Sequence, residues 1–101
     1  MQTQAHVVQI DKWEVVKGSA FWLALPPETE RGSLHGLVTG HMRVSDGESA
    51  TTSTMLRTDG TYVYTKSGTA YLLGEPDEVY ESRFPDAKAR LLAALPRAGQ
   101  L

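Results

Sequence analysis

The sequence contains no cysteine, and this absence excludes several kinds of chemistry at once. Disulfide frameworks, zinc sites with thiolate ligands and cysteine nucleophiles all require sulfur atoms that this chain lacks. The absence also fits a reducing compartment. The N-terminus has no basic start followed by an apolar run, and no apolar stretch approaches the roughly 18 residues of a membrane helix. We therefore expect a cytoplasmic protein without a signal peptide or membrane anchor.

The sequence also lacks an excess of positive charge. It has 10 basic and 12 acidic side chains, and its net charge is −2. Nucleic-acid-binding domains carry basic patches that neutralise phosphates, so a nucleic-acid partner is disfavoured. Glycine-rich phosphate loops, the H-E-x-x-H zinc motif and the G-x-S-x-G nucleophile motif are absent. We predict no cofactor and no metal, and non-enzymatic function is favoured over catalysis.

The length and composition are those of one globular domain. With 101 residues, 41% hydrophobic and 22% charged, the chain has room for one core. We therefore expect a single domain over residues 1–101, with residues 95–101 as a frayed tail. Low asparagine and isoleucine usage, with arginine favoured over lysine, suggests a GC-rich bacterial, phage or mobile-element source.

Two turn dipeptides divide the segment from Thr51 to Leu73, which is rich in strand-forming Thr, Val, Tyr and Leu. Asp59-Gly60 and Ser67-Gly68 are typical of tight hairpin turns, so the segment is predicted to be a three-stranded antiparallel meander. Two-residue turns would pair Tyr64 with Tyr71. One face of the meander is then expected to carry all three of its tyrosines: Tyr62, Tyr64 and Tyr71.

The earlier half of the chain predicts further strands. Residues 6–10 have strand character, and residues 13–25 are predicted to form a strand pair with a turn at residues 17–19. Residues 33–44 alternate apolar and polar positions, with two glycines on the apolar side. Glycines within a strand suit a bend or a close backbone approach. Asp46-Gly47 offers a third hairpin turn. A two-residue loop would place Val38 on one face of the sheet and a loop one residue longer would place it on the other, and the sequence leaves this register open.

The pattern changes to helical spacing after Leu73. Pro76 and Pro85 suit first turns of helices, and apolar residues at 87, 91, 92 and 95 form a stripe. A short helical turn near 77–83 and a helix near 86–95 are predicted. The fold class is therefore α+β: a bent, small-barrel-like antiparallel sheet of five or six strands, with a C-terminal helix.

The histidines give weak support for a catalytic site. His35 and His41 are six residues apart, and a regular strand separates them by roughly 20 Å. A histidine-dependent enzyme acting through His41 is retained as an alternative. A second alternative is a small-ligand or nucleotide-binding β-barrel whose mouth is lined by tyrosines and a histidine.

Two groups of residues are the candidate binding positions. The first is the tyrosine face with Arg57, which is predicted to lie opposite Tyr62; tyrosine and arginine are enriched at protein interfaces. Whether the C-terminal helix covers this face is left open. The second is an acidic run that is suited either to a basic partner or to helix N-terminal charge compensation. Its members are Glu75, Asp77, Glu78 and Glu81.

Small size, mild acidity and the missing motifs together favour a protein-interaction module, such as an adaptor or a small inhibitor. The partner would be another protein, which the sequence does not identify. The polar run at 49–54 is predicted to be an edge strand. Pairing of this edge with a second copy would give a homodimer.

Overall fold

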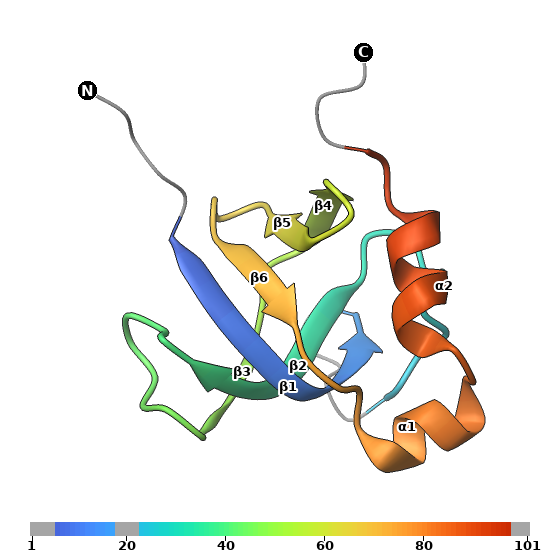
Figure 1. The fold of residues 1–101 in the computed structure, drawn as a ribbon, viewed down its shortest axis with the longest axis horizontal. Helices are drawn as coiled ribbons and strands as arrows, with labels where there is room; N and C mark the ends of the chain where they lie inside the picture. The colour runs from blue at the N-terminus through green and yellow to red at the C-terminus, as the bar shows by residue number, and fades with distance from the viewer. Residues whose placement is uncertain (1–5, 18–22, 98–101) are drawn as a thin grey trace.

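A computed structural model describes residues 6–17 and 23–97 as one mixed sheet with two short helices (Figure 1). The elements, in chain order, are β1 (Val7–Val16), β2 (Ser33–Thr39), β3 (Ser49–Thr51), β4 (Met55–Thr58), β5 (Tyr62–Thr65), β6 (Ala70–Leu73), α1 (Glu78–Arg83) and α2 (Ala87–Ala94). The strand order is β3-β2-β1-β6-β5-β4. This confirms the α+β class, the predicted five or six strands and both helical segments, but the sheet is mixed and not wholly antiparallel. The sheet is open and not a barrel, because β3 and β4 are its two edges.

The centre of the sheet is a parallel pair, β1 with β6, whereas all other neighbouring strands are antiparallel. β1 is one strand with a bulge between Asp11 and Glu14, where Lys12 has a φ of 49°. The bulge lets Trp13 enter the core, where it is fully buried. The predicted strand at 6–10 and the first strand of the pair predicted over 13–25 are thus one strand. The expected turn near residues 17–19 lies largely outside the described residues.

The strand predicted over 33–44 ends at Thr39, because Gly40 takes a φ of 84°. Val38 N donates a hydrogen bond to Glu48 O at 3.0 Å, so the loop between these two residues is much longer than two residues. Asp46-Gly47 is therefore not a two-residue turn. Val38 therefore faces the core, and Met42 lies in the loop with 78% of its surface exposed. The run at 49–54 contributes only Ser49–Thr51 to the sheet edge available to a second copy.

The predicted meander is confirmed as β4–β5–β6, but neither predicted register is correct: β4–β5 differs by two residues at Arg57 and β5–β6 by one. Thr65 N donates to Thr69 O at 3.1 Å, which makes a three-residue loop with Gly68 at a φ of 95°. Val63 therefore pairs with Tyr71, and Tyr64 pairs with Ala70. A one-residue shift moves a side chain to the other face, so the prediction that Tyr71 lies beside Tyr64 was wrong.

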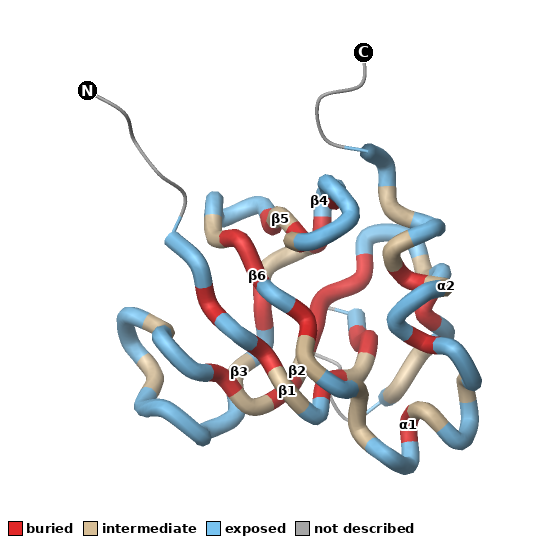
Figure 2. Tube along the Cα trace, viewed as in Figure 1, coloured by how far each residue is buried: buried red, intermediate tan, exposed pale blue. Residues whose placement is uncertain are grey.

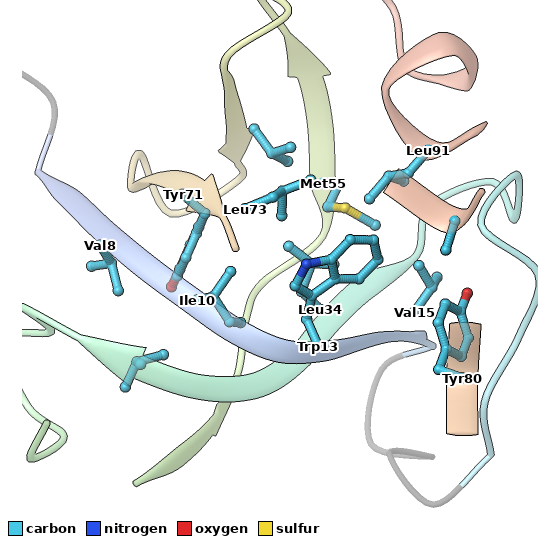
Figure 3. Close-up of a cluster of buried hydrophobic side chains, with 13 residues drawn as sticks. Val8, Ile10, Trp13, Val15, Leu34, Met55, Tyr71, Leu73, Tyr80 and Leu91 are labelled. Atoms are coloured by element: carbon cyan, nitrogen blue, oxygen red, sulfur yellow. The ribbon is translucent and has the colours of Figure 1, made fainter. Parts of the chain in front are cut away.

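The hydrophobic core lies on one face of the bent sheet, and both helices pack against it at one end (Figures 2 and 3). Trp13 and Leu34 from the sheet are buried with Tyr80 of α1 and Leu91 of α2. The Trp13 indole N–H donates to the Gly74 carbonyl at 3.0 Å, and the Tyr80 hydroxyl donates to the carbonyl of Leu25. Both large polar aromatics are therefore buried with a hydrogen-bond partner.

The end of the described chain is held on the edge of the sheet. Leu95 packs against the core, and the Pro96 carbonyl accepts a hydrogen bond from Thr58 N at 2.9 Å. Of the predicted tail, residues 95–97 thus contact the sheet and the core, and residues 98–101 lie outside the described part of the chain. This contact covers part of the β4 edge.

Candidate functional site

The face of the sheet opposite the helices carries the residues of the first predicted binding group, apart from Tyr71. Cross-strand pairs share a face, so the register places Arg57, Tyr64, Ala70 and Val7 in one row. Tyr62 and Leu72 begin the next row. We call the following set the tyrosine face: Val7, Arg57, Tyr62, Tyr64 and Leu72. Val7 is 47% exposed and Leu72 36%, so no helix of the described chain covers it.

A hydrogen-bonded turn holds Tyr64 in place. Oδ1 of Asp59 accepts hydrogen bonds from the backbone N–H groups of Thr61 and Tyr62 at 2.9 and 2.8 Å. Its Oδ2 accepts a hydrogen bond from the Tyr64 hydroxyl at 2.7 Å. The Asp-Gly sequence favours this turn because a short carboxylate reaches the backbone two and three residues on. The Tyr64 ring is therefore fixed at both its strand and its hydroxyl end.

Arg57 lies over the ring of Tyr64, with its Cζ atom 5.9 Å from the ring centroid. It is paired with Tyr64 across the strands, and not with Tyr62 as predicted. The hydrogen bonds from Tyr62 N, Thr61 N and the Tyr64 hydroxyl lower the pKa of Asp59. The hydrogen bond to Asp59 in turn raises the pKa of Tyr64. The arrangement thus presents a cation, a neutral phenol and a carboxylate in a row.

Tyr71 has a different role from the other two tyrosines. It lies on the core face, where only 4% of its surface is exposed, and burial raises its pKa. The sequence Lys66-Ser67-Gly68 could have predicted the burial of Tyr71, because a three-residue hairpin loop has glycine at its third residue, which takes a positive φ. Val7 was missed as a member of the face because its position depends on the β1–β6 pairing. Leu72 was missed because the longer loop at Gly68 shifts the β5–β6 register by one residue.

The acidic run divides into two pairs with different surroundings. Asp77 caps α1, because its Oδ2 accepts hydrogen bonds from the N–H groups of Val79 and Tyr80 at 3.1 and 3.2 Å. The Glu81 carboxylate accepts hydrogen bonds from the first backbone N–H groups of the α2 region, at 2.8 and 3.3 Å. Glu75 and Glu78 are exposed, and their carboxylates bond to none of the described residues. Helix capping therefore accounts for half of the run.

The histidines lie in separate local structures. Nδ1 of His41 accepts a hydrogen bond from Arg43 N at 2.9 Å, within the loop that follows β2. Nδ1 of His35 lies 2.8 Å from the hydroxyl of Thr51, its partner on the neighbouring strand β3. Glu14 is paired with His35, and its pKa is raised, first by partial burial and second by Asp77. Over residues 6–17 and 23–97, no three histidine, aspartate or glutamate side chains are placed to hold a metal ion.

None of the described helices is long and apolar enough to cross a membrane. Comparison of the chain with protein-family models, curated proteins and solved structures found no match. The fold and the site define a small α+β domain with a mixed sheet and two short helices packed on one of its faces.

Proposed function

We propose that this chain is a non-enzymatic protein-interaction module, an adaptor or a small inhibitor, which binds its partner through the tyrosine face. The observation that carries the proposal is the fixed Arg57–Tyr64–Asp59 arrangement beside two exposed aliphatic side chains. Tyrosine and arginine supply a large share of binding energy at protein interfaces. A ring that is already held in place loses little conformational entropy on binding.

The chemistry of the face favours a protein over a nucleic acid. Single-stranded nucleic acids combine stacking on aromatic rings with a positively charged groove along their backbone. Arg57 is the only cation among the residues that define the tyrosine face, and the carboxylate of Asp59 lies within hydrogen-bonding distance of Tyr64. A partner surface with an apolar centre and a few polar groups would fit this composition better than a row of phosphates.

The test is affinity capture from an extract of the source organism, followed by titration of the purified partner. We expect a stoichiometric protein partner whose affinity for the Tyr64→Ala variant and for the Arg57→Ala variant is about tenfold weaker in each case. Met42→Ala is the matched control, because Met42 is a large exposed apolar side chain that does not belong to the tyrosine face. Thermal unfolding of each variant verifies that the fold is intact.

Two results would overturn the proposal. One is a captured protein that binds the wild type, Tyr64→Ala and Arg57→Ala equally well. The other is a turnover activity of the purified chain with no stoichiometric protein partner.

A further inference from the structure

A groove lies between α1 and α2 and shares no residue with the tyrosine face. Its apolar lining comes from Pro76, Val79, Ala89 and Leu92. Val79 is 68% exposed, although Tyr80 beside it is fully buried. With a volume of about 1140 Å³, the groove is larger than the roughly 300–1,000 Å³ of sites for small molecules. Its size therefore suits a segment of polypeptide.

The charge of the groove defines the chemistry of that segment. Five acidic and two basic side chains line it, a net charge of −3, which exceeds the −2 of the whole chain. The acidic members are Glu75, Asp77, Glu78, Glu81 and Asp86, and the basic members are Lys12 and Lys88. Among the described residues, the carboxylates of Glu75 and Glu78 have no ion pair or hydrogen bond, so they are available to an incoming cation.

We propose that the groove between α1 and α2 binds a basic, amphipathic segment of another protein. An apolar side chain of that segment packs against Val79 and Leu92. Its lysine or arginine side chains meet the carboxylates of Glu75 and Glu78 at the rim. The apolar lining supplies affinity by removing the exposed Val79 from water, and the carboxylates select the sign of the partner's charge. This second surface is independent of the tyrosine face.

The test uses the full chain and a fluorescein-labelled peptide of lysine and leucine, patterned as an amphipathic helix. A glutamate–leucine peptide of the same pattern and a lysine-only peptide are the comparison probes. We expect fluorescence anisotropy to show binding of the lysine–leucine peptide alone. Glu75→Gln/Glu78→Gln should weaken binding about fivefold at low salt, and less at high salt because salt screens exposed charges. Val79→Ser should weaken it at both salt concentrations.

The control variant is Glu30→Gln/Glu48→Gln, which removes the same charge from two exposed carboxylates outside the groove. It should bind the lysine–leucine peptide as the wild type does, as should Tyr64→Ala, since that residue belongs to the other surface. Equal binding by both charge-neutralised variants would show diffuse attraction and overturn the proposal. Failure of the lysine–leucine peptide to bind at all would also overturn it, and would leave the tyrosine face to its own test.

Discussion

At the scale of the residue, Gly36 of β2 allows the backbones of β1 and β2 to approach closely because it has no side chain. A Cβ atom there would stand 2.7 Å from the Asp11 carbonyl oxygen and 2.9 Å from the Cα atom of Trp13. Both are backbone atoms of the β1 bulge and cannot move aside as a side chain would. A glycine in this strand was expected to mark a bend or a close approach, and the close approach is what is found.

Gly36→Ala is therefore expected to lower the free energy of unfolding by about 2 kcal/mol, because the added methyl group overpacks the contact between β1 and β2. Urea unfolding followed by tryptophan fluorescence measures the change. Gly47→Ala is the matched control: no atom lies within 4 Å of its Cβ position, but its φ is 87°, so a cost of about 1 kcal/mol is expected. A smaller loss for Gly36→Ala than for Gly47→Ala would contradict this account.

At the scale of the element, α1 has only six residues and depends on its cap. A helix this short gains little from propensity, so tertiary packing and satisfied end groups must hold it. Asp77 satisfies two of the first N–H groups, and Tyr80 anchors the helix in the core. The proline, the acidic residues and the apolar stripe are all local signals, which is why the sequence predicted both helical segments correctly.

Asp77→Ala should lower the free energy of unfolding by about 1 kcal/mol, the usual effect of losing a helix cap. Chemical denaturation measures it, and circular dichroism would show the accompanying loss of helix. Glu78→Gln is the comparison, because its carboxylate caps nothing among the described residues and its loss should change stability by less than about 0.5 kcal/mol. Equal losses for the two variants would mean that Asp77 acts only through its charge.

At the scale of the whole molecule, the core contains two tyrosines that must stay protonated. Burial raises the pKa of both Tyr71 and Tyr80 above the ordinary value, most strongly for Tyr80. In the unfolded chain both hydroxyls lose their protons near pH 10, whereas in the folded protein they keep them to higher pH. The unfolded state therefore binds fewer protons above pH 10, and stability falls as the pH rises.

The free energy of unfolding should thus be insensitive to these groups below about pH 9 and should fall above pH 10. The slope is at most about 1.4 kcal/mol per pH unit for each tyrosine. Tyr80→Phe should make the alkaline slope shallower, although it costs about 1 kcal/mol at neutral pH through the lost hydrogen bond to Leu25. Denaturation midpoints between pH 7 and 11.5 measure this, and an unchanged slope in the variant would contradict it.

The sequence by itself determined where the turns of the meander lie, its strands, the helical C-terminal segment and the grouping of Arg57 with two tyrosines, but not the lengths of the turns. These features follow from backbone preferences and side-chain spacing over a few residues, which act locally. Only the tertiary structure decided the β1–β6 pairing, which joins strands some 60 residues apart and brings Val7 beside Ala70. It also decided which face of the sheet carries Tyr71, because one extra loop residue at Gly68 moves that side chain from the tyrosine face into the core.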